Sequence, residues 1–278
     1  MQLTVLVDNN TLIDKYLTAE PGVCYHLKID GKTFLFDTGY SDVFLRNAAI
    51  LGIDISDIDS VIISHGHNDH SWGLTHLAQH LDRTNHPCVK KIKLVAHPNA
   101  FVPKYHEDKS IGANLPADSA PSFFERVNQT GVYYITDNLI FLGEIERGND
   151  FEGLHPIGKT LNCCGHEVDD FVIDDSAIVY TSPEGIVIIT GCSHSGVCNI
   201  IDYAIKVTGD KRVRAVIGGF HLLNAETSTL ARTSDYFKQL NAQALYPCHC
   251  TDLKAKIVLA SIVDIEEVGV GMVLNFPV

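Results

Sequence analysis

Three histidines and an aspartate lie close together directly after a short apolar run. The stretch VIISHGHNDHSWG covers residues 61–73 and contains His65, His67, Asp69 and His70. His65 and His67 are two residues apart, so their side chains leave an extended backbone on the same face. Asp69 and His70 follow where the chain turns into a helix and can approach from a second direction. Because zinc, manganese and iron accept imidazole and carboxylate ligands, the cluster predicts a divalent metal site.

Hydrophobic periodicity predicts the elements that position this cluster. Two extended runs flank Asp30-Gly31, which is a strong hairpin signal. We expect further strands at 3–7, 61–64, 92–97, 132–136, 139–143, 177–181, 185–190, 214–219 and 242–248, then a last pair of short strands. We expect helices at 42–51, from about 71, at 196–207, 225–240 and 252–260. The pattern predicts one integrated α/β domain spanning 1–278, with two sheets covered by helices.

Residues 98–131 interrupt this pattern with prolines, mixed charges and little periodicity. Long loops inside compact domains are usually lids or binding insertions. Tyr105 and neighbouring aromatic residues could stack a flat ring such as a pterin, or could form a small core of the loop itself. Lys104 or Lys109 could attract an anion. We therefore predict an insertion at about 98–131 that contributes Lys104 and Tyr105 to a substrate pocket.

The overall charge limits the classes of partner. The formal net charge is −13, and no run of Lys or Arg could follow a phosphate backbone, so no nucleic-acid partner is expected. No apolar stretch is long enough for a spanning helix, and the first residues lack a signal-peptide pattern, so a cytoplasmic protein without a membrane partner is expected. A small anionic substrate would depend on divalent ions to reverse the local field. Homo-oligomerisation stays open.

The H-x-H-x-D-H pattern of residues 65–70 resembles the signature of the metallo-β-lactamase superfamily. FLFDTG before it, and TGCSHSGVCNI, GGFHL and PCHCT after it, resemble one branch of that superfamily. The branch includes archaeal enzymes that join a dihydropterin to a ribofuranosyl-aminobenzene phosphate, and bacterial relatives called metal-dependent hydrolases. The resemblance implies a four-layer αββα sandwich with one or two divalent ions, zinc first and manganese or iron as alternatives.

The resemblance also assigns roles to individual residues. It implies that His65 and His67 bind a first ion, and that Asp69 and His70 bind a second. His194 and His249 each follow a predicted strand and are the candidates for the remaining ligands. Cys192 stands where the superfamily usually has a bridging aspartate, and it could be a bridging thiolate or an ordinary buried thiol.

Three further residues have alternative interpretations. Asp37 could hold a ligand histidine by a hydrogen bond, as in related folds, or could cap its own turn. His221 ends another predicted strand and could be a proton donor, a substrate contact or a buried hydrogen-bonded histidine. Trp72 could form a wall of the pocket or pack on the adjacent helix.

These patterns favour an enzyme, with Asp69 and His221 as catalytic candidates. The first interpretation is a hydrolase that uses metal-bound water on a small anionic substrate, such as a phosphoester. A pterin-type transferase that releases pyrophosphate is the first alternative, and a non-catalytic metal-containing binding protein is the second. Redox chemistry at a di-iron site is weakly supported, because His67 occupies the position where the relevant relatives have a glutamate.

Overall fold

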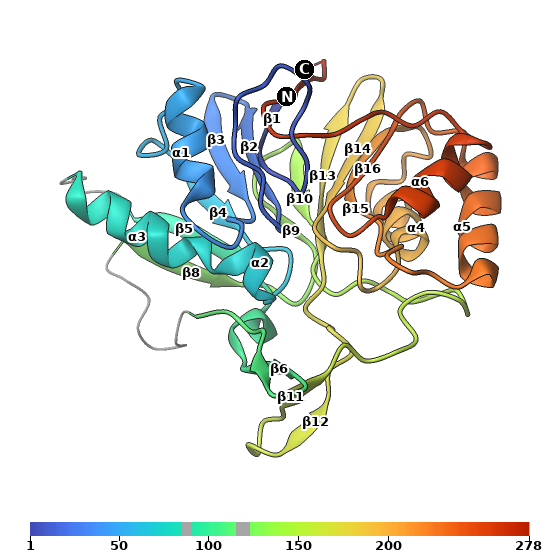
Figure 1. Ribbon diagram of the computed structural model, residues 1–278, viewed down its shortest axis with the longest axis horizontal. Coiled ribbons are helices and arrows are strands. Elements are labelled where there is room, and N and C mark those ends of the chain that lie inside the picture. Colours follow the sequence, from blue (N-terminus) through green and yellow to red (C-terminus); the bar gives the residue numbers. More distant parts are fainter. Residues whose placement is uncertain (85–90, 115–122, 278) are drawn as a thin grey trace.

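The computed structural model describes residues 1–84, 91–114 and 123–277. Two β-sheets lie face to face in the middle of the molecule (Figure 1). The first has the order β17 (Val273–Asn275), β1 (Gln2–Val7), β2 (Cys24–Ile29), β3 (Lys32–Phe36), β4 (Ser60–Ile62), β5 (Ile92–Ala96) and β8 (Phe124–Asn128). The second has the order β16 (Leu245–Cys248), β15 (Val213–Gly219), β14 (Gly185–Thr190), β13 (Ala177–Ser182), β10 (Leu139–Phe141) and β9 (Tyr133–Tyr134).

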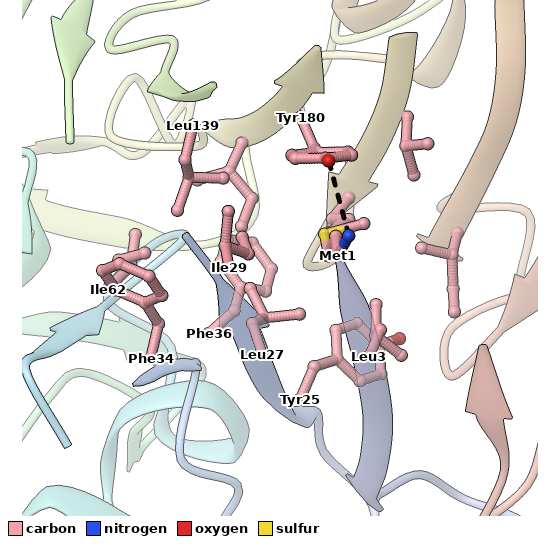
Figure 2. Packing of buried hydrophobic residues seen from close by; sticks show 14 of the residues in the cluster. Met1, Leu3, Tyr25, Leu27, Ile29, Phe34, Phe36, Ile62, Leu139 and Tyr180 are labelled. Carbon is pink, nitrogen blue, oxygen red and sulfur yellow. Dashed lines mark hydrogen bonds between the residues drawn. The ribbon is translucent and has the colours of Figure 1, made fainter. Parts of the chain in front are cut away.

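Apolar side chains from both sheets form the central core. On β2, Tyr25, Leu27 and Ile29 alternate with Cys24 and His26, so the first three face the second sheet. Figure 2 shows this packing close to the chain start, where the Met1 amino group donates to Tyr180 Oη at 3.4 Å. The alternation explains why one strand can contribute to two cores.

Helices cover the outer face of each sheet. α1 (Val43–Ile50), α2 (Asn68–Ser71) and α3 (Gly73–Arg83) lie on the side of the first sheet, and α4 (Val197–Thr208), α5 (Thr227–Leu240) and α6 (Leu253–Ala260) on the side of the second (Figure 1). The helical spacing on α3 buries Leu74, Leu77, Ala78 and Leu81 against the first sheet. The four-layer αββα sandwich predicted above is therefore confirmed.

Parallel pairing explains how residues distant in the sequence meet. β3 and β4 are parallel in the first sheet, and β14, β15 and β16 are parallel in the second. The carboxyl ends of parallel strands lie at the same edge, which is where α/β folds place their sites. Asp37 and His249 directly follow the last residue of such a strand, and His221 lies two residues after the end of β15.

The insertion predicted at 98–131 is corrected by the structure. Its last part, Phe124–Asn128, is strand β8 and pairs in parallel with β5, so it belongs to the first sheet. Its middle, 115–122, lies outside the described residues. The rest holds a short 3-10 helix (Pro98–Phe101), β6 (Lys104–His106) and β7 (Lys109–Ser110). Among the aromatic residues, Phe101 and Phe124 are buried in the core beneath α3, so they cannot stack a ligand.

A third, small sheet was not predicted. Its order is β12 (Glu167–Asp169), β11 (Lys159–Leu161), β6 and β7, and it projects from the sandwich (Figure 1). Its strands are two or three residues long, which is too short for a clear alternating pattern. Two short strands were expected at the end of the chain. Among the described residues, one of them forms, as β17. No helix in the described part of the chain is long and apolar enough to cross a membrane.

A buried ion pair fastens the third sheet to the sandwich. Lys104 Nζ on β6 lies 2.9 Å from Asp170 Oδ2 and 2.8 Å from Asp174 Oδ1, and its side chain is only 2% exposed. The other oxygen of Asp174 accepts a hydrogen bond from Gly66 N at 2.8 Å. The lysine therefore neutralises the carboxylate that holds the backbone between His65 and His67.

Replacing Lys104 tests this connection. Lys104→Ala leaves two buried carboxylates without their cation, and we expect it to lower the free energy of unfolding by about 3–5 kcal/mol in urea denaturation. The matched control is Lys159→Ala on β11, which removes a solvent-exposed pair with Asp169 and should change stability little. Equal effects of the two substitutions would contradict the assignment.

His26 predicts a pH dependence of stability. Its side chain is buried on the helix side of β2, and burial, followed by the charge of Lys28, lowers its pKa from 6.5 to about 4. The unfolded chain therefore takes up a proton at a higher pH than the folded protein. The free energy of unfolding should fall as the pH falls from about 6.5 towards about 4, and His26→Leu should flatten this curve. Urea titrations at several pH values measure it, and an unchanged slope in the variant would refute it.

Candidate metal centre

The structure brings the six predicted ligands together in two adjacent groups. His65, His67 and His194 form one group, and Asp69, His70 and His249 form the other; within each, one donor atom per residue lies within 4.8 Å of the others. The first group joins the end of β4 to the turn after β14. The second joins α2 to the end of β16.

Three buried imidazoles form the first group. His65 Nε2 and His67 Nδ1 are 3.0 Å apart, and the His194 ring lies 4.7 Å from both histidine rings. Burial lowers the pKa of His67 to about 4, and burial together with neighbouring imidazoles lowers the pKa of His65 and His194. The group is therefore neutral and has lone pairs to offer.

Carboxylates give the second group a different character. His249 Nε2 lies 3.3 Å from both Asp69 Oδ2 and His70 Nε2. Burial acts to lower the pKa of His70, but the charges of Asp69 and Asp37 outweigh it and raise the pKa to about 9. This group therefore favours a positive charge, which a divalent cation can supply in place of the proton.

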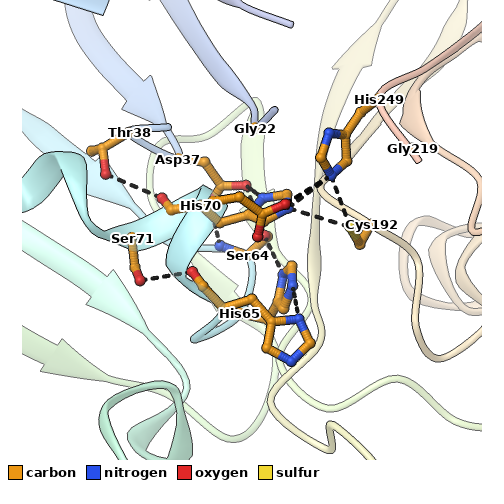
Figure 3. Close-up of polar contacts among 12 residues, drawn as sticks. Gly22, Asp37, Thr38, Ser64, His65, His70, Ser71, Cys192, Gly219 and His249 are labelled. Carbon is orange, nitrogen blue, oxygen red and sulfur yellow. Dashed lines mark hydrogen bonds and ion pairs between the residues drawn. The ribbon is translucent and has the colours of Figure 1, made fainter. Parts of the chain in front are cut away.

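Asp37 holds the signature in place from behind (Figure 3). Its Oδ1 accepts from Ser64 N at 2.7 Å, and its Oδ2 accepts from Ser64 Oγ and from His70 Nδ1, each at 2.7 Å. The predicted hydrogen bond to a ligand histidine is present. Because Nδ1 of His70 donates to the carboxylate, Nε2, which faces His249, is the nitrogen that could bind an ion once it has lost its proton.

Cys192 lies between the ligands of the two groups. Its Sγ is 3.3 Å from His70 Nε2 and 3.1 Å from His249 Nε2 (Figure 3), and it also forms a group of donor atoms with His65 and His70. Burial, followed by the neighbouring Cys250, raises the pKa of the Cys192 thiol. The sulfur thus lies near donor atoms of both groups, and Cys250 adds a second thiol beside His249.

Several turns at this edge adopt an unusual backbone conformation. Asp37, Ser193, His221 and His249 have φ values of 57°, 59°, 53° and 50°. Left-handed conformations of residues other than glycine cost of order 1–3 kcal/mol and concentrate at functional sites. Here they turn the chain at strand ends. The His194 ring then lies beside His65 and His67, and His249 lies beside Asp69 and His70. The His221 ring lies beside that of His194.

The donor groups fit divalent ions. Ligand nitrogens about 2.0–2.1 Å from a tetrahedral zinc ion lie roughly 3.3 Å apart, close to the spacings of 3.0 and 3.3 Å within the two groups. Among the described residues, neither ring nitrogen of His194 has a hydrogen-bond partner, although both are buried. Unpaired buried polar atoms are costly, and a bound cation would satisfy the free lone pair.

A cavity of about 370 Å³ adjoins the first group. His194 and His221 line it, and their rings lie 4.4 Å apart. The opposite walls come from the loop 150–157 and from α5, including Phe151, Leu154 and Arg232. This volume lies within the usual range of about 300–1,000 Å³ for small-molecule sites.

Sequence reasoning missed most of these cavity walls. The loop 150–157 has no periodicity, His155 has no partner in the sequence, and Arg232 lies within an ordinary helical pattern. The signal present was the position of α5 as the next helix after β15, the strand that ends two residues before His221. That position brings the first turns of α5 to the edge where the ligands gather.

Three residues predicted for the pocket do not line this cavity. The Trp72 indole stacks on Tyr40 at 4.8 Å and donates from Nε1 to Gly112 O at 2.8 Å. Lys104 is buried between two carboxylates, so its charge cannot attract a ligand. Tyr105 lies on the small third sheet. The signature stretch and the segment 98–131 that supplied these predictions do not contribute to this cavity, whose lining comes from residues 150–157, 193–196 and 220–232.

Buried carboxylates fix the wall of the cavity and the turn that carries His194. Glu152 accepts hydrogen bonds from Cys198 N at 3.0 Å and Asn199 N at 3.3 Å in the first turn of α4. Asp175 Oδ2 accepts from Ser195 N at 2.9 Å and Ser195 Oγ at 2.5 Å, and burial raises the pKa of Asp175 to about 6. Both contacts hold the segment 193–199 from outside the metal centre.

Comparison with known proteins places this architecture in one family. The family model of the metallo-β-lactamase superfamily matches residues 17–249, so the chain belongs to that superfamily. A 7,8-dihydropterin-6-methyl-4-(β-D-ribofuranosyl)-aminobenzene-5′-phosphate synthase from Methanocaldococcus jannaschii is 30% identical over 256 residues, covering 88% of this chain and 85% of its own. An uncharacterised protein from the same organism is 30% identical and covers 98% of this chain and 99% of its own.

A solved structure supports the same placement. It is described as a metal-dependent hydrolase of the β-lactamase superfamily, and it matches this chain with a TM-score of 0.83 and 29% identity. The match covers 100% of this chain and 99% of that chain. Both the sequence relatives and this structure therefore extend over nearly the whole sandwich.

Asp37 provides a test of the metal centre. Asp37→Asn keeps the shape but weakens the hydrogen bond that orients His70, and we expect metal affinity to fall by about 10- to 100-fold. The measurement is competition with a chromogenic chelator. Asp42→Asn, at an exposed carboxylate before α1, is the control and should bind metal like the unaltered protein. Full affinity in Asp37→Asn would show that the carboxylate does not position the ligand.

Proposed function

We propose that this protein is a metal-dependent hydrolase that acts on a small anionic substrate, such as a phosphoester, with one or two divalent ions. The observation that carries the proposal is the arrangement of two adjacent donor groups beside a cavity of about 370 Å³. The neutral imidazoles and the carboxylate of Asp69 suit zinc best, with manganese or iron as alternatives. The open cavity favours a reaction over a purely structural metal.

Different residues of this chain would bind the ions, donate a proton and exclude water in such a reaction. Bound divalent ions would polarise the bond to be cleaved and lower the pKa of water. His65, His67 and His194 would hold one ion, and Asp69, His70 and His249 the other. His221 faces the cavity, so its ring can donate a proton to the leaving group or contact the substrate. The apolar walls exclude water around the reacting bond.

A pterin-type transferase that releases pyrophosphate is the second candidate. The identity of 30% to the dihydropterin-related synthase favours it. The same donor groups could hold a pyrophosphate leaving group, because phosphate oxygens are good ligands for divalent ions. Release of pyrophosphate from a pterin diphosphate that requires an aminobenzene acceptor and joins it to the pterin would identify the transferase, whereas cleavage by water without an acceptor would identify the hydrolase.

The test combines metal analysis with a substrate panel. Protein purified without added metal should contain one or two equivalents of divalent ion and should hydrolyse at least one phosphodiester, ester or lactone. His194→Ala should lose more than about 100-fold in kcat/KM, because even residues that only support ligands are worth 10- to 100-fold. His76→Ala on α3 is the control and should keep both metal and activity.

Two outcomes would count against the proposal. Metal content and activity that survive in His194→Ala would refute the metal centre as the active site. Metal bound tightly by the unaltered protein, with no turnover of the panel or of a pterin diphosphate, would favour a binding protein instead.

A further inference from the structure

The cavity beside the first donor group has an unequal distribution of charge. Its lining includes three carboxylates, on Asp150, Glu152 and Glu226, and the single arginine Arg232. Among the described residues that line the cavity, Arg232 is the one with a permanent positive charge. An anionic group in this cavity would therefore be stabilised at Arg232, away from the ions.

Two contacts hold the guanidinium at the wall. Its Cζ lies 4.2 Å above the ring of Phe151, and its Nη2 contacts Asp150 Oδ1. The stack on Phe151 orients the plane of the guanidinium, which reduces the entropy lost when it binds a planar or tetrahedral anion. Arg232 is thus pre-oriented although its side chain is 48% exposed.

The partner carboxylate can be replaced by a ligand. Asp150 is 83% exposed, and an exposed ion pair is worth at most about 1 kcal/mol, so an incoming anion competes with it easily. Glu152, by contrast, accepts hydrogen bonds from Asn149 Nδ2 and from two backbone amides, which offset its charge. Because these donors partly neutralise Glu152, its negative charge repels an anion in the cavity less than an unpaired carboxylate at the same position would.

Hydroxyl and apolar groups complete the wall around Arg232. Ser228 and Thr229 precede Arg232 by four and three residues on α5, so all three side chains share one face of the helix, and all three line the cavity. Phe220 and Leu222, both buried, line it beside His194 and His221. A ligand that contacts both the histidines and Arg232 must cross this apolar surface.

From this arrangement we propose that Arg232 is a specificity residue that binds a second anionic group, a carboxylate or a phosphate, on the part of the substrate that does not react. The substrate is then a small organic dianion with a flat or apolar body between its charged groups. This inference rests on the proposed function and adds the substrate class. Hydrogen bonds to charged groups contribute about 1.5–3 kcal/mol, which corresponds to a preference of roughly 10- to 100-fold.

Matched substrates test the preference. The compounds are 4-nitrophenyl benzyl phosphodiesters that carry a para carboxylate, a para phosphonate (the non-hydrolysable counterpart of a phosphate) or a para carboxamide on the benzyl ring. The metal-loaded protein should show a kcat/KM about 10- to 100-fold higher for one or both anionic compounds than for the carboxamide, mainly through KM. The better of the two anionic compounds identifies the group that Arg232 binds.

Variants assign the preference to Arg232. Arg232→Ala should abolish it, and Arg232→Lys should keep only part, because an ammonium group cannot form the two parallel hydrogen bonds of a guanidinium. Arg46→Ala removes an exposed arginine that pairs with Asp42 on α1 and should keep the full preference. Circular dichroism checks that each variant is folded. Equal rates for all three compounds in the unaltered protein, or a full preference in Arg232→Ala, would overturn the proposal.

A binding experiment separates this proposal from the proposed function. Benzylphosphonates with the same three para groups are not hydrolysed, and calorimetry measures their affinity for the metal-loaded protein. Tighter binding of the anionic compounds that depends on Arg232, without turnover of any phosphodiester, would support the subsite while contradicting the hydrolase. Turnover without any preference or Arg232 dependence would support the hydrolase and contradict the subsite.

Discussion

The carboxylate of Asp37 is the interaction on which the rest of the site depends. It is fully buried, yet it accepts three hydrogen bonds, from Ser64 N, Ser64 Oγ and His70 Nδ1. These contacts join the ends of β3 and β4 to α2, so one side chain fixes both the approach of the signature and the direction of one ligand. A buried charge is tolerated only when such partners surround it. The buried carboxylate therefore lies at a strand end, where a backbone amide that has no partner in the sheet can donate to it.

Next to Asp37, the fold buries several imidazole rings close together and away from water. His65, His67 and His194 cannot all be protonated in a buried cluster, and neutral rings need partners for their lone pairs. The left-handed turns at Ser193, His221 and His249 bring side chains from the second sheet to that cluster. The conformational strain of these turns is offset by the packing of two complete sheets behind them, whose apolar residues are almost fully buried.

Much of this arrangement could be predicted from the sequence. The spacing of His65, His67, Asp69 and His70 is local, and the strand ends before His194 and His249 are visible as apolar runs, so the ligands could be named. The cavity could not be predicted, because Phe151 and Arg232 reach the site only through the packing of α5 and a loop without periodicity. Lys104 was misassigned for a related reason. A sequence shows that this lysine lies in an aperiodic insertion, but its burial between Asp170 and Asp174 depends on residues more than sixty positions away.

The hydrogen bonds that Glu152 accepts from α4 have a consequence for how this protein adapts to ligands. The loop 150–157 forms the cavity wall, and Glu152 supplies the acceptor that the first amides of α4 would otherwise lack. A ligand large enough to push the loop outward must also uncap that helix, which begins three residues after His194. The size of a molecule in the cavity and the position of the His194 side chain are thus linked through Glu152 and α4. An oversized molecule would therefore disturb the segment that carries His194, a candidate ligand, before it could occupy the cavity fully.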